Sequence, residues 1–120
     1  MPMPLDLDTL TDLYPDPEGR RQFLQRALDI LREDRQALQD ALGRHAYGQA
    51  AELAHRLQGS VAFLTGEPEH CARILLPLQH ASRRGQSAEC QQARTAAMEL
   101  LVALESAMEQ SLSPDPTRLG

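Results

Sequence analysis

His55 is the residue whose type and position most clearly suggest chemistry. It lies in the segment AELAHRLQGSVAFLTG, residues 51–66, which has the pattern of an amphipathic helix. The apolar residues of that helix centre on one direction, and at 100° per residue His55 points roughly 160° away from it. We therefore expect the imidazole ring to face solvent. An exposed imidazole is largely unprotonated near neutral pH, so its ring nitrogens can act as nucleophiles.

The helix surface around His55 carries residues that are mostly very small. At three, four and seven residues from His55 lie Ala51, Glu52, Gln58, Gly59 and Ala62. Glycine inside a helix costs roughly 1 kcal/mol relative to alanine, so Gly59 requires a reason. We infer that Gly59 removes a side chain that would obstruct a large partner. Ala51, Glu52, Gly59 and Ala62 are the predicted docking surface.

Phosphoryl transfer is the reaction that suits such a histidine. In-line attack requires a free ring nitrogen, an open approach and donors for the phosphoryl oxygens. Gln58, about one turn beyond His55, can donate an amide N–H to such an oxygen. On the next predicted helix, Gln79 and Arg83 are four residues apart, where they could orient the ring and add positive charge.

The elements that must position these residues are all helical. Helical periodicity runs along the chain, and no alternating pattern of strand type is present. Because hydrophobic residues make up 42% and aromatic residues only 3%, the core must consist of Leu and Ala, which favour helices. We predict a leader helix from Asp8 to Tyr14, capped by Asp8, and four longer helices. Their approximate ranges are Pro17 to Leu42, Ala46 to Leu64, Pro68 to just before Arg83, and Ser87 to Ser111.

Each long helix has one apolar stripe. The predicted inward residues are Leu24, Leu28, Leu31, Leu38, Leu42, Ala50, Leu53, Leu57, Val61, Leu64, Cys71, Ile74, Leu75, Leu78, Ser82, Ala93, Ala97, Leu100, Leu101, Leu104 and Met108. Arg35 interrupts the first stripe, Gly43 is a stop signal, and Pro77 predicts a kink or a local break. Short connections between the helices predict an antiparallel, up-down-up-down four-helix bundle of residues 1–112, followed by a disordered tail, 113–120.

Composition narrows the classes of partner. With 17 acidic and 12 basic residues the formal net charge is −5, which argues against nucleic acid or an anionic membrane as the main partner. No apolar stretch is long enough to span a membrane, and the start lacks the features of a signal peptide, so we expect a cytoplasmic protein. Cys71 and Cys90 are in no metal-binding spacing and are predicted to lie too far apart to form a disulfide.

Other catalytic motifs are missing from the sequence. There is no GxxxxGKS phosphate loop and no nucleophile elbow, so nothing suggests that the chain binds ATP or acts as a kinase itself. His45, His70 and His80 have neither the spacing nor the cysteine neighbours of a metal site, and we predict none. A di-metal helical bundle would require inward Glu and Glu-x-x-His motifs, which are not found at inward positions.

The segment HRLQGS resembles the signature of the histidine phosphotransfer (HPt) family, His-x-Leu-Lys-Gly-Ser or -Ala, on the second helix of a four-helix bundle. His55, Leu57, Gly59 and Ser60 match in place. The lead-in LTDLYPDPEGRRQFLQRALDIL and the segment LPLQHASRRG also look like this family, the latter with a Gln followed four residues later by Arg. The resemblance thus covers most of the chain.

The resemblance implies a shuttle in a two-component phosphorelay. His55 would accept a phosphoryl group from the phospho-aspartate of a receiver domain and pass it to another receiver. The implied partners are response-regulator receiver domains and a hybrid sensor histidine kinase. We expect a monomer without a cofactor of its own, with Mg²⁺ supplied by the receiver.

The sequence departs from the family pattern at two positions. Gln58 stands where the family usually has Lys, and Thr65 stands where a glycine is usual, with Gly66 one place later. The first departure removes the cation nearest to the phosphoryl group. It leaves a second interpretation open, a non-catalytic helical adaptor that binds a receiver or another protein through the same surface.

Overall fold

The computed structural model describes residues 5–113, so the predicted tail lies outside the described residues apart from Ser113. Within this range the chain forms five α-helices and no strand, as the sequence predicts. The helices are α1 (Leu7–Leu13), α2 (Pro17–Gly43), α3 (Tyr47–Thr65), α4 (Pro68–Arg83) and α5 (Ser87–Leu112). Their ends lie within one or two residues of the predicted ones.

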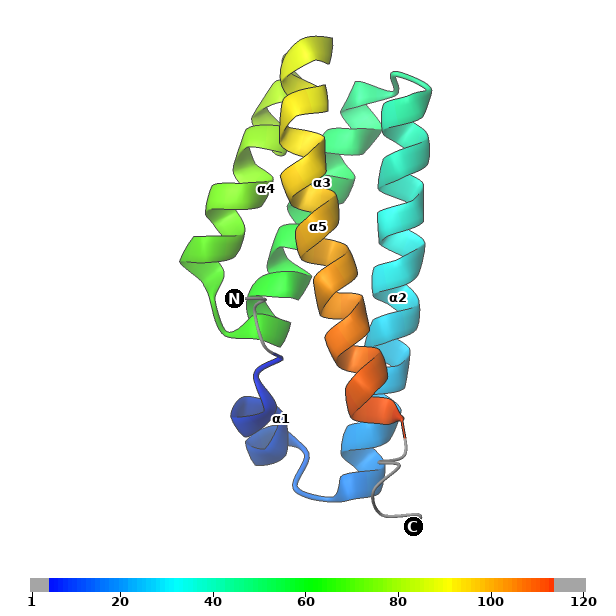
Figure 1. Ribbon diagram of the computed structural model, residues 1–120, viewed down its shortest axis with the longest axis vertical. Helices are drawn as coiled ribbons and strands as arrows, with labels where there is room; N and C mark the ends of the chain where they lie inside the picture. The colour runs from blue at the N-terminus through cyan, green and yellow to red at the C-terminus, as the bar shows by residue number, and fades with distance from the viewer. Residues whose placement is uncertain (1–4, 114–120) are drawn as a thin grey trace.

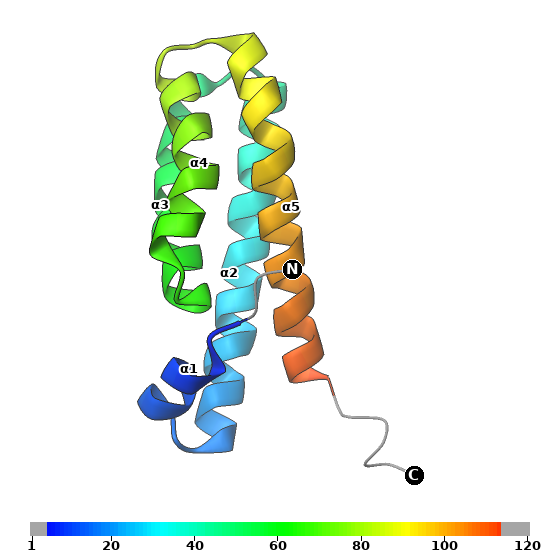
Figure 2. The same cartoon turned by 60° about the vertical axis from the view of Figure 1, so that its left-hand side comes forward.

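The four long helices lie side by side along the longest axis of the molecule (Figure 1). Helix α3 packs against α2 and α4, and α5 packs against the same two helices, so the four enclose a common core. Figure 2 shows the α2–α3 and α4–α5 connections at one end, whereas α3 and α4 are joined at the other. Helix α1 lies beside the beginning of α2, at the end of the molecule opposite to the α2–α3 and α4–α5 connections.

The core is aliphatic. All of the predicted inward residues are buried except Ile74 and Ala93, which are half-buried. None of the four aromatic side chains is fully buried. The core therefore depends mainly on leucine and alanine packing, and aromatic residues such as Phe23 and Tyr47 pack against its edge.

Helix ends differ from the predictions in two places. Asp6, not Asp8, caps α1: its carboxylate accepts hydrogen bonds from the backbone N–H of Thr9 (3.2 Å) and from its hydroxyl (2.7 Å), and these bonds lower the pKa of Asp6. Helix α2 includes Gly43, and the chain instead reverses at His45, which adopts a positive φ of 59°. The backbone N–H groups of His45 and Ala46 satisfy the last carbonyls of α2, which compensates for a conformation usually taken by glycine.

Pro77 neither ends nor divides α4, which continues from Pro68 to Arg83. The local break that the sequence suggested is therefore not present. Proline removes a single backbone hydrogen bond, and the apolar face of α4, including buried Leu75 and Leu78, continues on both sides of Pro77. Burial of that face favours an unbroken helix.

Arg35 interrupts the apolar stripe of α2 because it has a charged partner. Its guanidinium donates Nε and Nη2 to the carboxylate of Glu105 on α5, whose side chain is only 6% exposed. Arg32, one turn earlier, reaches Glu109 at 2.7 Å. A charge-assisted, two-donor pair satisfies a carboxylate that would otherwise be costly to bury, and it joins α2 to α5.

Candidate functional site

His55 lies in the middle of α3 and is exposed, as the sequence predicts. Apolar side chains hold the opposite side of α3 in the core, with Leu57 and Val61 completely buried. This burial fixes the rotation of the helix about its axis, and so directs His55 outward. The ring makes no hydrogen bond with any residue that the structure describes, so both nitrogens are available to a partner.

Gly59 provides open space beside His55. Apart from its chain neighbours and the backbone of its own helix, a Cβ atom built at this glycine would meet no atom within 4 Å, so packing against the rest of the fold does not require glycine there. On a helix, Gly59 is a surface neighbour of His55, four residues away. The absence of its side chain leaves the approach along α3 unobstructed.

The predicted docking surface is only partly exposed. Glu52 and Gly59 are exposed and Ala62 is half-buried, but Ala51 is buried, with 4% of its surface accessible. Ala50, Leu53 and Ala54 of α3 are buried as well, so the buried arc of this helix is wider than one apolar stripe implies. The contact of α3 with α4 is more extensive than that of any other helix pair, and we infer that it covers Ala51.

Gln79 is buried, with 4% of its surface accessible, and its Oε1 has no hydrogen-bond partner. Gln79 is eleven residues from the start of α4, and His55 is ten residues from the end of α3. Since a short connection joins these two ends, a rise of 1.5 Å per residue places both residues roughly 15–17 Å from it. The amide of Gln79 thus lies at the level of His55, although no hydrogen bond joins them.

Arg83 and Gln58 lie at the edges of this region. Arg83 is exposed at the end of α4, one turn beyond Gln79, and forms no ion pair within the described residues. Gln58 is half-buried. No hydrogen bond connects His55 with Gln58, Gln79 or Arg83, and of the three predicted assisting residues Gln79 is buried, Gln58 half-buried and Arg83 exposed.

An ion pair that the sequence did not predict begins at the residue after His55 and joins α3 to α2. Arg56 donates Nε and Nη2 to the carboxylate of Asp34 on α2, at 3.2 and 2.8 Å. These bonds raise the pKa of Arg56. The Asp34 side chain is 11% exposed and that of Arg56 63% exposed, so the guanidinium is held at the surface. The partners are 22 residues apart in the sequence, which explains why helical spacing gave no signal.

Three of the four aromatic residues gather near this face, between α1, α2 and α3. The Tyr14 and Phe23 rings stack at 4.8 Å, and Phe23 meets Phe63 edge to face at 6.1 Å. Phe63 is 44% exposed and Ile30 49%, and both line a groove of about 200 Å³ between α2 and α3. Phe63 is two turns beyond His55 on α3, so apolar surface lies near the histidine.

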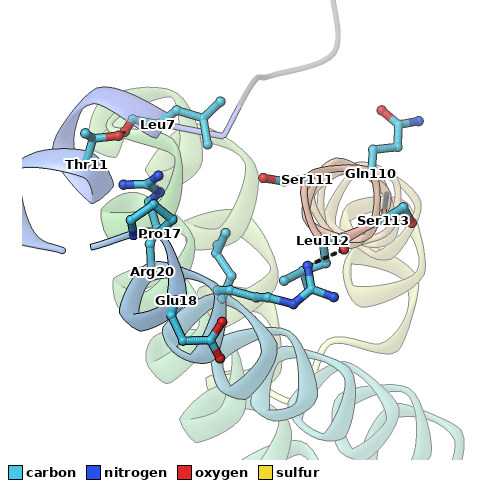
Figure 3. Close-up of a pocket in the computed structure, with 11 residues that line it drawn as sticks. Leu7, Thr11, Pro17, Glu18, Arg20, Gln110, Ser111, Leu112 and Ser113 are labelled. Carbon is cyan, nitrogen blue, oxygen red and sulfur yellow. Dashed lines mark hydrogen bonds between the residues drawn. The ribbon is translucent and has the colours of Figure 1, made fainter. Parts of the chain in front are cut away.

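A wider cavity of about 640 Å³ opens at the beginning of α2 (Figure 3). Residues from α1, the beginning of α2 and the end of α5 line it, and none comes from α3 or α4. Arg21, one of the residues that line it, donates a hydrogen bond to the carbonyl of Leu112 at 2.7 Å. Neither histidine nor cysteine lines this cavity, so the candidate residue His55 lies elsewhere.

Other reactive residues form no second site. Cys71 and Cys90 are buried free thiols, and burial raises the pKa of Cys71. His45 contacts the hydroxyl of Tyr47 through Nδ1 at 2.7 Å. Across residues 5–113, no group of three or more His, Cys, Asp or Glu residues is arranged to hold a metal ion.

In the same range no helix is both long and apolar enough to cross a membrane.

Comparison with known proteins identifies no relative: no family model matches the chain, and neither a curated protein nor a solved structure matches it.

Proposed function

We propose that this protein is a cytoplasmic histidine phosphotransfer protein built on an antiparallel, up-down-up-down four-helix bundle. The observation that carries the proposal is the combination at α3: an exposed His55 without protein partners, beside the open space at Gly59. A large partner can reach the imidazole there without moving any side chain at position 59. The match of the segment HRLQGS to the HPt signature supports the same assignment.

In the proposed reaction, the lone pair of a ring nitrogen of His55 attacks the phosphorus of an aspartyl phosphate on a receiver domain. The N–P bond forms as the P–O bond to the aspartate breaks, and the aspartate leaves as a carboxylate. Transfer to a second receiver reverses these steps, so no net oxidation or hydrolysis occurs. The divalent metal and the catalytic lysine belong to the receiver in this scheme.

Gln79 has a proposed role in orienting the ring. Its Oε1 is buried and unpartnered, which costs roughly 1–3 kcal/mol if nothing compensates. A hydrogen bond from Nδ1–H of His55 would satisfy this oxygen and leave Nε2 unprotonated for attack. Gln58 and Arg83 are proposed to contact the phosphoryl oxygens from either side, Gln58 as a neutral donor and Arg83 as a cation.

Incubation with receiver domains that carry phosphate on aspartate tests the proposal. We expect label to move from the receiver to this protein as a phosphohistidine, which is labile in acid and stable in base. Label that hydrolyses without ever appearing on this protein, across a broad panel of receivers, would contradict phosphotransfer.

A non-catalytic adaptor is the second candidate, and two observations favour it. Gln58 provides no charge where a Lys is usual in the family that the segment resembles. The groove at Phe63 and Ile30 offers apolar surface that could bind a protein without any chemistry at His55. An adaptor would bind receivers equally well with His55 replaced by Gln and would never acquire label.

A further inference from the structure

Arg56 follows His55 directly and its guanidinium is held in place. Asp34 accepts hydrogen bonds from Nε and Nη2, at 3.2 and 2.8 Å. No acceptor for the third nitrogen, Nη1, is found within the described residues. A guanidinium has five N–H donors in a fixed plane, so Asp34 can hold one edge while Nη1 remains free to donate elsewhere.

The open space at Gly59 is shared by Arg56 and His55. Gly59 is three residues beyond Arg56 and four beyond His55, and both spacings make neighbours on a helix surface. Apart from its chain neighbours and the backbone of its own helix, no atom lies within 4 Å of the position that a Cβ atom of Gly59 would occupy. A group attached to the His55 ring and the Nη1 edge of Arg56 can therefore approach each other across this gap without a side chain between them.

The charges around His55 make Arg56 important for a negatively charged adduct. Glu52 is exposed three residues before His55, and the carboxylate of Asp34 on α2 is paired with Arg56. Gln58 is neutral, and Arg83 is on the neighbouring helix about one turn beyond the level of His55. Without Arg56, a phosphohistidine carrying close to two negative charges would have the carboxylate of Glu52 as a neighbour and no cation on its own helix.

We propose that Arg56, oriented by Asp34, is the cation that stabilises the phosphoryl group on His55, a role that rests on the proposed phosphotransfer function. Arg56 keeps its two hydrogen bonds to Asp34 and donates from Nη1 to a phosphoryl oxygen. Asp34 is a positioning residue that fixes the guanidinium at the edge of the site. This pair takes the place of the lysine that position 58 lacks.

Chemical phosphorylation with phosphoramidate tests the role of Arg56 without any partner protein. A ring nitrogen of His55 attacks phosphorus, the N–P bond forms, and the P–N bond to ammonia breaks as ammonia takes up a proton. We expect Arg56→Gln to shorten the half-life of the phosphohistidine by about three- to tenfold, since a charge-assisted hydrogen bond is lost. Arg56→Lys should recover part of the effect, because it keeps the charge but not the planar fork.

Arg44→Gln is the matched control. Arg44 also pairs with an aspartate, Asp40 at 2.9 Å, but it lies about 15 Å farther along α2 than Asp34. This variant should leave the half-life unchanged. Added salt should shorten the half-life in the wild type more than in Arg56→Gln, a dependence that a purely structural role for Arg56 would not produce.

The outcomes separate the two proposals. Label on the wild type but not on His55→Gln, with a half-life that falls in Arg56→Gln, supports both. Label on His55 with the same half-life in Arg56→Gln and Arg56→Lys overturns the role of Arg56 and leaves the proposed function standing. A wild type that takes no label, or takes as much as His55→Gln, overturns both.

Discussion

The buried amide of Gln79 on α4 lies at the level of the exposed His55 on α3, each about ten residues from the connection between their helices. Among residues 5–113, the amide oxygen has no hydrogen-bond partner and neither ring nitrogen of His55 forms a hydrogen bond. A buried acceptor without a donor is unfavourable for folding. The unpartnered oxygen of Gln79 therefore favours a role for this residue at His55 over a role in stability.

Gln79→Leu separates these two roles. Because an unsatisfied buried oxygen is replaced by an apolar group of similar size, we expect the free energy of unfolding to stay the same or to rise by roughly 1 kcal/mol. Phosphorylation of His55 should nevertheless slow, since the ring loses its orienting acceptor. Urea denaturation and the rate of label uptake measure the two effects. A stable variant with an unchanged rate would show that Gln79 does not orient His55.

Gly59→Leu tests whether the open space matters for docking. Leucine favours helix over glycine by nearly 1 kcal/mol, and nothing in the fold opposes the new side chain, so stability should be unchanged or higher. Receiver binding should weaken, because the side chain would block the approach to His55. Gly43→Leu is the control, since Gly43 is also helical, exposed and unobstructed. Equal receiver affinities in both variants would contradict a role for Gly59 in the approach.

Gln58→Lys examines the departure from the HPt pattern. A lysine one turn from His55 on an exposed surface would stabilise the phosphoryl group by at most about 1 kcal/mol. With cations already present, we expect the half-life of the phosphohistidine to change by a few-fold at most. Arg83→Ala should have a larger effect than Gln58→Lys, and Arg56→Gln a larger one still. A tenfold gain in phosphoryl occupancy in Gln58→Lys, with Arg83→Ala silent, would mark the wild type as a weak carrier.

Arg35→Met addresses the fold alone. The variant leaves Glu105, 5% exposed, without its two-donor partner, although Arg32 remains nearby at 3.7 Å. We expect a loss of about 2–4 kcal/mol in unfolding free energy, because an uncompensated buried carboxylate is costly. Arg35→Met combined with Glu105→Leu should recover most of the loss. If the double variant is as unstable as the single one, packing of the arginine stem, and not its charge, joins α2 to α5.

Sequence reasoning predicted the helices well because each has a clear apolar stripe. The leucines of α2 and the burial of Leu57 and Val61 in α3 follow from a period of 3.6 residues. The exposure of His55 follows from the same period. These properties depend on residues close together in the chain.

The features that were missed depend on contacts between helices. Ala51 is buried because α4 covers that side of α3, which a single helix cannot reveal. The Arg56–Asp34 and Arg35–Glu105 pairs join residues 22 and 70 positions apart. The positive φ of His45 was not predicted, because this conformation is usually assigned to glycine and Gly43 stood two residues earlier.

The most direct test compares His55→Gln with His80→Gln, which removes another exposed histidine on the adjacent helix. Both proteins are incubated with the same phosphorylated receivers, and acid-labile label is quantified and located by mass spectrometry. Both should unfold within about 1 kcal/mol of the wild type, since exposed side chains contribute little packing. The account predicts label on the wild type and on His80→Gln, and none on His55→Gln. Equal labelling of His55→Gln and the wild type would contradict it.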